Sequence, residues 1–313
     1  MLENALSRRT RGGCLLLVLA AALVAGCARR EPPKKTKDWI IPSSEDIQKW
    51  IHQKRDTNHN MVKIPPGRYK LGDNTFRGNR ERIHNLEKAF WIDKFEVTNN
   101  DWWFFLWATK DSREFFAAPP VVMGEYDTDK WVQAHNYFKY DYSRAKYPVR
   151  AVLYGEAEMF ARFVRKRLPT ADEWEIAARG SQGYRYPWGD TYTQADWKTK
   201  ANTSFDLVRA GQKDAGIERV HDTVEVDKLE AGQSPFGCYN MADNVSEWTT
   251  SEVTTGHGEW KQVSRDERPM AKVVKGGSFW SRQVGALAAQ FIDVMAETAS
   301  DQFRIGFRCA RDD

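Results

Sequence analysis

The sequence predicts a single α+β domain that is dominated by loops. Short strand-like segments alternate irregularly with helical patterns, and much of the C-terminal half is rich in Gly, Asn, Asp and Trp. The chain has 313 residues, 13 tryptophans and no visible internal repeat. The part from residue 61 onward carries most of these tryptophans and is long enough to bury one sizeable core.

The first 26 residues resemble an export signal. Three arginines between positions 8 and 11 precede an apolar stretch at 15–23, which is too short for a relaxed bilayer crossing. The run 24–27 resembles a lipobox, so we expect cleavage before Cys27 and acylation of its thiol. An ordinary signal with a chance cysteine is the alternative. The arginine pair at 8–9 also leaves open whether export follows the general or the twin-arginine route.

The predicted mature chain is nearly neutral. Removing residues 1–26 lowers Lys+Arg from 47 to 44 and Asp+Glu from 43 to 42, which leaves a net charge of +2. Residues 27–43 are polar and rich in Lys, Arg and Pro, as expected of a lipid-anchored linker. No basic stripe indicates a nucleic-acid partner, and we interpret the short run 165–167 as a solvated turn. Nothing after residue 27 is apolar enough to cross a bilayer, so we expect membrane attachment through lipid alone, on the periplasmic or surface face of the envelope.

Helices and strands can be placed along the rest of the chain. Ser43 opens an S-x-x-D capping box, which predicts a short helix within 44–60. This helix leads into a domain at 61–313. Apolar periodicity and capping residues predict helices at 44–54, from Thr98 onward, around 157–164 and from Thr170 to Gly180. Composition predicts strands at 61–64, 68–71, 89–97, 272–279 and 304–309.

Only two cysteines remain within the domain, Cys238 and Cys309. An oxidising compartment would allow one disulfide between them. Two buried free thiols are the alternative, and both readings stay open at this point.

Several sequence blocks occur in an order that is typical of one family. They are MVKIPPG at 61–67, EVTN at 96–99, KRLPTADEWE at 166–175, YPWGD at 186–190, PFGCYNMADNVSEW at 235–248, KGGS at 275–278 and GFRCA at 306–310. Together they resemble the formylglycine-generating enzyme, or sulfatase-modifying factor, domain over residues 61–311. The resemblance implies a modified C-type-lectin-like fold that is poor in secondary structure. We assign Trp174, Trp188 and Trp248 within these blocks to the core.

The resemblance also locates the family's catalytic cysteine pair. In the family's enzymes two cysteines after the Gly-Gly-Ser turn bind copper(I) and oxidise a substrate cysteine to formylglycine. Those positions fall on Ser281 and Ala286, and neither a hydroxyl nor a methyl group suits copper(I). We therefore expect no copper, no catalytic residue and no formylglycine generation.

Calcium is the cofactor that the resemblance implies. The family's ligands map onto the Asn240 side chain, the Asp243 and Val245 carbonyls and the Glu247 carboxylate, which are hard oxygen donors in one loop. A hydrogen-bonded loop without metal is the alternative reading. A second family site maps onto Asn202, Thr203, Glu218 and Val220.

Three functions remain in competition. The favoured one is a non-catalytic, lipid-anchored scaffold that binds another envelope protein, because the segment 110–146 is unusually aromatic and charged. A long packed loop is the structural alternative for this segment. The second function is a lectin-like surface receptor with contact residues Phe279, Trp280, Ser281, Arg282 and Gln283. The third is a family enzyme with altered chemistry, either an oxidoreductase or an accessory maturation factor.

Overall fold

The computed structural model describes residues 42–74, 79–110, 112, 142–203, 205–206, 217–218, 222–252, 271–281, 291–295 and 304–313. The predicted lipidation residue Cys27 and most of 110–146 lie outside the described residues, as do Val220, Arg282, Gln283 and Ala286. None of the helices in the described ranges is long and apolar enough to span a bilayer.

The predicted helices are confirmed, and three of these four begin at a Ser or Thr capping residue. They are α2 (Ser44–Arg55), α3 (Asn99–Thr109), α5 (Tyr154–Phe163) and α6 (Ala171–Arg179), with short 3-10 turns η1 (Tyr142–Arg144) and η2 (Glu230–Gly232). Ser43, Thr98 and Thr170 each accept the backbone N–H three residues ahead, which satisfies a donor that the first turn of a helix leaves free. Gly180 ends α6 at a φ of 65°, in the region that favours glycine.

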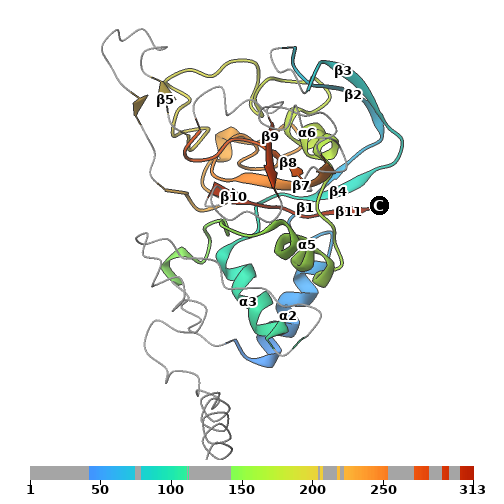
Figure 1. Cartoon of the computed structure of the whole chain (residues 1–313), viewed down its shortest axis with the longest axis vertical. Coiled ribbons are helices and arrows are strands. Elements are labelled where there is room, and N and C mark those ends of the chain that lie inside the picture. The colour runs from blue at the N-terminus through green and yellow to red at the C-terminus, as the bar shows by residue number, and fades with distance from the viewer. Residues whose placement is uncertain are drawn as a thin grey trace, which may run out of the picture. The chain divides into compact units, whose positions relative to one another are not determined.

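Within the described residues the strands are short and form four small sheets; most of them are labelled in Figure 1. β1 (Met61–Ile64), β4 (Phe90–Asp93) and β11 (Ala310–Asp312) pair antiparallel in the order β1-β4-β11, so both ends of the domain meet in one sheet. A second sheet has the order β10-β7-β8-β9, and β10 runs parallel to β7. Its strands are β7 (Ser246–Glu252), β8 (Ala271–Lys275), β9 (Phe291–Met295) and β10 (Ile305–Gly306). Two hairpin-like pairs complete the set, β2 (Gly67–Leu71) with β3 (Arg82–Leu86) and β5 (Phe205–Asp206) with β6 (Ile217–Glu218).

Three strand predictions were too long. The 89–97 segment is a strand only at 90–93, because the chain then turns and the Val97 N–H bonds the Phe307 carbonyl. The 272–279 segment ends as a strand at Lys275, where Gly276 adopts a φ of 78°. The 304–309 segment supplies only the two residues of β10, and the chain then passes on to β11 in the other sheet.

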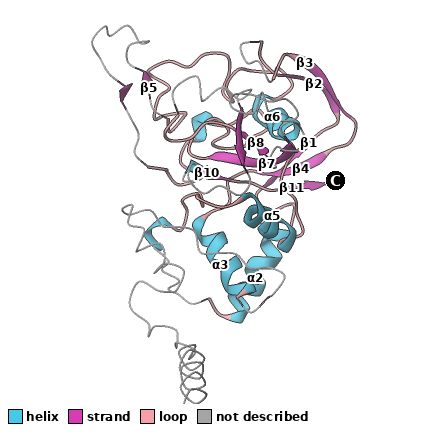
Figure 2. Ribbon diagram, viewed as in Figure 1, coloured by secondary structure: helices cyan, strands magenta, loops and turns pink. Residues whose placement is uncertain are grey.

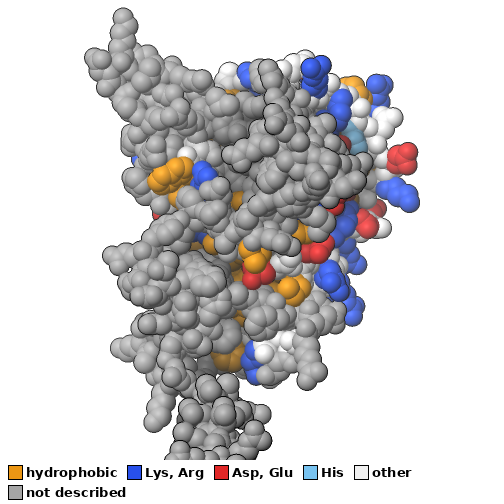
Figure 3. Space-filling view, in the orientation of Figure 1, with side chains coloured by type: hydrophobic (Ala, Val, Ile, Leu, Met, Phe, Trp, Pro, Cys, Tyr) orange, Lys and Arg blue, Asp and Glu red, His pale blue; other side chains and the backbone are white. Residues whose placement is uncertain are grey.

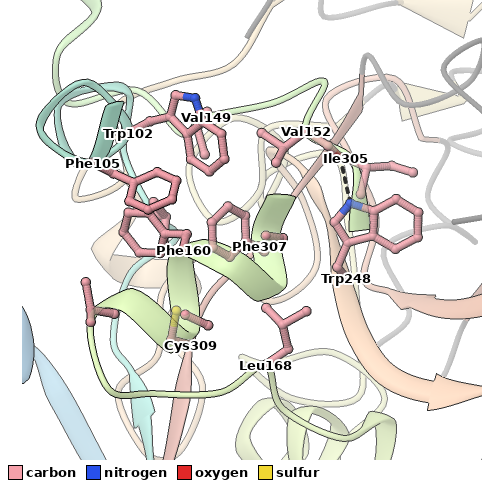
Figure 4. Packing of buried hydrophobic residues seen from close by; sticks show 14 of the residues in the cluster. Trp102, Phe105, Val149, Val152, Phe160, Leu168, Trp248, Ile305, Phe307 and Cys309 are labelled. Carbon is pink, nitrogen blue, oxygen red and sulfur yellow. Dashed lines mark hydrogen bonds between the residues drawn. The ribbon is translucent and has the colours of Figure 1, made fainter. Parts of the chain in front are cut away.

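The main core lies where α2, α3 and α5 pack together at one end of the domain (Figure 2). Phe160 and Phe307 lie at its centre (Figure 4). Their ring centroids are 5.3 Å apart. Trp248 lies at the edge of this cluster and donates its indole N–H to the Val152 carbonyl at 2.8 Å. Trp50 of α2 is only 5% exposed and belongs to the same cluster, so this helix is part of the domain's core.

A second core cluster surrounds α6 and is crossed by a buried ionic network. The Glu175 carboxylate, 1% exposed, accepts the Gly72 backbone N–H at 2.6 Å and bonds Arg179 and Lys275 at 2.7 and 2.9 Å. Asn79 donates to its second oxygen. These partners hold the pKa of Glu175 at about 2, against the opposing effect of burial.

The run 165–167 corrects the prediction of a solvated turn. The Lys166 side chain is 2% exposed and its Nζ lies 2.6 Å from Asp93. Arg167 binds both carboxylate oxygens of Glu173 at 2.7 Å. Only Arg165 fits the prediction, because it is exposed and has a φ of 58°.

The two alternatives for the cysteines resolve to free thiols. Cys238 and Cys309 are both fully buried, unbonded to each other and members of different core clusters. Burial raises the pKa of Cys238 to about 11 and that of Cys309 well above its ordinary value. Both thiols are therefore protonated core residues in the folded chain.

Candidate functional site

The loop before β7 is tied to the segment before α3. The Asn240 side-chain amide donates to Glu96 Oε2 at 2.6 Å and to the Val226 carbonyl at 3.0 Å. Asn244 makes a second, longer bond of 3.3 Å to the same Glu96 oxygen. Asn240 and Asn244 have φ values of 55° and 61°, a left-handed conformation that asparagine tolerates better than most residues. The two asparagines therefore set the backbone conformation of the loop, and their hydrogen bonds to Glu96 connect it to the segment before α3.

The Glu247 carboxylate forms a buried ion pair with Arg308. Its two oxygens accept from Arg308 Nη2 and Nε, both at 2.7 Å, and Oε2 also accepts the Trp174 indole N–H at 2.8 Å. Both charged side chains are fully buried. Arg308 also donates to the carbonyls of Asp93, Lys94 and Tyr239, so its guanidinium joins β4, the 235–248 loop and β7.

The two predicted calcium sites meet at Asp243. Its carboxylate accepts the backbone N–H of Asn202 at 2.5 Å, and burial raises its pKa to about 7. The Asn202 side chain donates to the Asp222 carbonyl, and the Thr203 hydroxyl lies 2.8 Å from the Tyr192 hydroxyl. The Glu218 side chain and Val220 lie outside the described residues, so the second calcium site stays a prediction.

The predicted first calcium site fits the structure only in part. Asn240 Oδ1 is buried and has no hydrogen-bond partner, as a metal-binding oxygen would be. In contrast, both oxygens of Glu247 are engaged by Arg308, so Glu247 does not offer a free carboxylate. In the described ranges, no three His, Cys, Asp or Glu side chains come together as a metal-binding cluster.

The turn that would carry the catalytic cysteines is closed by hydroxyl groups. Ser281 Oγ accepts the Ser278 backbone N–H at 2.9 Å and lies 3.3 Å from Ser278 Oγ, while the Ser281 N–H bonds the Ser278 carbonyl. The Ser281 side chain therefore stabilises the turn locally.

The structure corrects one of the predicted ligand contacts on this turn. Phe279 is 2% exposed, its backbone N–H bonds the Asn244 carbonyl, and the Arg150 guanidinium lies 5.1 Å above its ring. A residue in this position is a core residue and not a surface contact. Trp280 and Ser281 are half-buried.

Of the three tryptophans assigned to the core, Trp174 and Trp248 are fully buried. Trp188 is only partly buried and stacks on Tyr186, with ring centroids 5.4 Å apart. On the face in Figure 3, basic and acidic side chains of the described residues are interspersed.

The fold and the site define a loop-rich α+β domain of the C-type-lectin-like class. The sulfatase-modifying factor enzyme 1-like domain matches residues 47–313, and the chain belongs to this family. It is 28% identical to the uncharacterized protein YfmG of Bacillus subtilis (strain 168), over 77% of this chain and 54% of that protein. The chain thus spans about half the length of YfmG.

Two further comparisons concern a curated relative and a solved structure. It is 26% identical to the inactive Cα-formylglycine-generating enzyme 2 of Bos taurus, over 84% of this chain and 91% of that protein. The solved structure of Treponema denticola variable protein 1 superposes with a TM-score of 0.51 and 18% identity, over 81% of this chain and 95% of that one. The latter likeness is one of fold.

Sequence reasoning missed two residues of the site, Glu96 and Arg308. Both lie inside the family blocks, in EVTN and GFRCA, where a charged residue stands among apolar or small neighbours. A charge in such a context indicates a buried partner. The partner itself is distant in sequence and needs the fold to identify it.

Proposed function

We propose that this chain is a non-catalytic, lipid-anchored member of its family that acts as a binding or scaffold module in the bacterial cell envelope. The observation that carries the proposal is Ser281, which stands where the family's enzymes need a thiolate. Its hydroxyl is a poor copper(I) ligand and is committed to the Ser278 turn.

The comparison with the bovine relative supports a non-catalytic role. That relative is named an inactive enzyme, and it aligns over nearly its whole length. The domain can therefore exist without the family's activity. Attachment at Cys27 rests on the lipobox sequence, and a binding role rests on the aromatic segment 110–146.

Two other functions remain as alternatives to this one. A lectin-like receptor would bind through the turn at 279–283, but the burial of Phe279 removes one of its five expected contacts. A family enzyme with altered chemistry would need a reactive group other than the missing cysteine pair.

The catalytic question is tested with the mature chain, copper(I), oxygen and a Cys-x-Pro-x-Arg peptide. We expect no formylglycine by mass spectrometry, while a family enzyme with both cysteines converts the same peptide. Turnover by the wild-type chain would refute the non-catalytic assignment.

The scaffold role is tested by photo-crosslinking in intact cells. A photoreactive amino acid replaces Trp131 in the aromatic segment or, as the control, the exposed Lys49 of α2. We expect one dominant protein adduct from position 131 and none from position 49. Adducts at neither position, or equal adducts at both, would contradict a partner bound through 110–146.

The lipid anchor has its own test. Labelled palmitate is expected to appear in the wild-type chain and to disappear in Cys27→Ser, with loss of the protein from the membrane fraction. Label that persists in Cys27→Ser contradicts acylation at this cysteine.

A further inference from the structure

Three arginines lie close together where α2 and α5 end. Arg55 donates through Nη2 to the Phe163 carbonyl at 2.9 Å, and Arg311 of β11 donates through Nη1 to the Arg55 carbonyl at 2.9 Å. Burial lowers the pKa of Arg55, and the charge of the nearby Arg165 lowers it further. The elements α2, α5 and β11 lie side by side (Figure 1). Arg55, Arg165 and Arg311 therefore form one basic cluster, the arginine cluster.

The arginine cluster has no carboxylate partner. In the part of the chain that the structure describes, no carboxylate oxygen lies within 4.0 Å of its three guanidinium groups. The acidic residues beside it in sequence are engaged elsewhere: Asp56 accepts the Asn58 backbone N–H at 2.9 Å, and Asp312 and Asp313 pair with other basic side chains at 2.6 and 2.7 Å. Like charges held close together without a counter-ion repel one another, so the cluster favours an anion from outside the domain.

Capping of the helix ends uses only part of the cluster's hydrogen-bonding capacity. Positive charge is favourable at the C-terminal ends of α2 and α5, and Arg55 and Arg311 each satisfy one terminal carbonyl there. A guanidinium has five N–H donors, and Arg55 Nε is buried with no hydrogen-bond partner. Arg165 and Arg311 are exposed. The donors that capping leaves over can therefore serve a ligand that approaches from solvent.

We propose that the arginine cluster binds the phosphate groups of anionic phospholipids at the membrane surface. The planar guanidinium fork matches the oxygens of a phosphate and binds two of them with parallel hydrogen bonds. The choice of a lipid phosphate rests on the proposed anchor at Cys27. The segment 28–41 can extend over at most about 50 Å, and it leads into α2, the helix that carries Arg55. A domain anchored at Cys27 thus stays within reach of the bilayer.

The first test measures binding to lipid vesicles without any acyl chain on the protein. The mature chain with Cys27→Ser is co-sedimented with vesicles of phosphatidylglycerol and phosphatidylcholine in equal amounts, and with vesicles of phosphatidylcholine alone. Adding Arg165→Gln and Arg311→Gln is expected to weaken binding to the anionic vesicles about 20–30-fold, because each arginine at an anionic surface contributes about fivefold in affinity. Since Cys27 is replaced throughout, the result is independent of whether this cysteine is acylated.

Arg68→Gln with Arg80→Gln is the matched control. Both arginines are exposed, lie in the part of the chain that forms β2 and β3, and also have no carboxylate partner among the described residues. We expect this control to bind the anionic vesicles within about threefold of the parent chain, because charges farther than a Debye length from the membrane are screened. Equal losses in the two double variants would show that net charge alone drives binding, and would overturn the arginine cluster as a site. Equal affinity for vesicles with and without phosphatidylglycerol would overturn it as well.

Inorganic phosphate distinguishes a free ion from a lipid headgroup. Melting temperatures are compared in phosphate and in chloride at equal ionic strength. A rise in phosphate that Arg165→Gln with Arg311→Gln removes, in a chain that does not bind anionic vesicles, would identify a free phosphate ion as the ligand and refute the membrane surface.

Arg165→Gln alone covers the case in which the double variant does not fold, because it leaves the bond from Arg311 to the end of α2 in place. We expect about fivefold weaker binding to the anionic vesicles. Unchanged affinity in this variant contradicts the proposal.

Discussion

The buried pair of Arg308 and Glu247 gives the sharpest stability prediction. Replacing Arg308 by Met keeps most of the side-chain volume but leaves the Glu247 carboxylate buried, with the Trp174 indole as its remaining bonded donor among those described. Removing one partner of a buried ion pair typically costs about 3–5 kcal/mol. Arg308 also satisfies three backbone carbonyls, each worth about 1 kcal/mol and not strictly additive. We therefore expect a loss of at least about 4 kcal/mol, a large part of the 5–15 kcal/mol that holds a typical domain folded.

The assay is urea unfolding followed by tryptophan fluorescence and circular dichroism, with a double-mutant cycle. Adding Glu247→Leu to Arg308→Met removes the unpaired charge, so the double variant is expected to lose at least about 2 kcal/mol less than the sum of the single variants. Lys70→Met is the control, because Lys70 and Glu81 form an ion pair with both side chains more than 40% exposed. Such a pair contributes about 1 kcal/mol or less.

Two outcomes would refute this reasoning. One is an Arg308→Met variant that is as stable as Lys70→Met. The other is a coupling energy near zero in the cycle. Either would mean that the centre of the domain is held by its apolar packing, and that the bidentate geometry contributes nothing measurable.

Three further predictions concern other parts of the core. The pKa of Glu175 is lowered to about 2 from an ordinary value of 4.5, so its ionised carboxylate stabilises the fold above pH 4.5 and this stabilisation is lost as the pH falls toward 2. Over this range the free energy of unfolding of the wild type should fall by about 3 kcal/mol more than that of Glu175→Gln. Urea unfolding at each pH measures the difference. Gly276→Ala should cost about 1–3 kcal/mol, because φ is 78° and the new Cβ would lie 2.9 Å from the Trp174 ring; a change within error in urea unfolding contradicts this. The thiols of Cys238 and Cys309 should react with Ellman's reagent only after denaturation, and dithiothreitol should leave the melting temperature unchanged; fast reaction of the folded chain would show that they are not buried.

The helices could be predicted because their signals are local. Ser43, Thr98 and Thr170 each lie beside the apolar pattern that they cap, and Gly180 adjoins the end of α6. Strand limits were less predictable because a strand ends where its partner ends. Phe90–Asp93 is bordered by β1 and by β11, and β11 lies at the other end of the chain.

The candidate site shows the same limit more strongly. The resemblance identified Asn240 as a ligand, and the structure leaves its Oδ1 without a partner, which agrees with that prediction without testing it. The resemblance also assigned Glu247 to the metal, but sequence spacing cannot reveal that Arg308 already occupies this carboxylate. Glu96 was missed for the same reason, since its partners Asn240 and Asn244 lie far along the chain.

The turn that carries Ser281 and the loop that carries Asn244 are joined by a backbone hydrogen bond. The geometry of the turn at Ser278–Ser281 is maintained by the Ser281 hydroxyl and by the Ser278 backbone. The loop that carries Asn244 is joined to this turn by the bond from the Phe279 N–H, so a defect in the loop would displace the turn and any surface built on it. The binding role that we propose would therefore depend on this loop being in place.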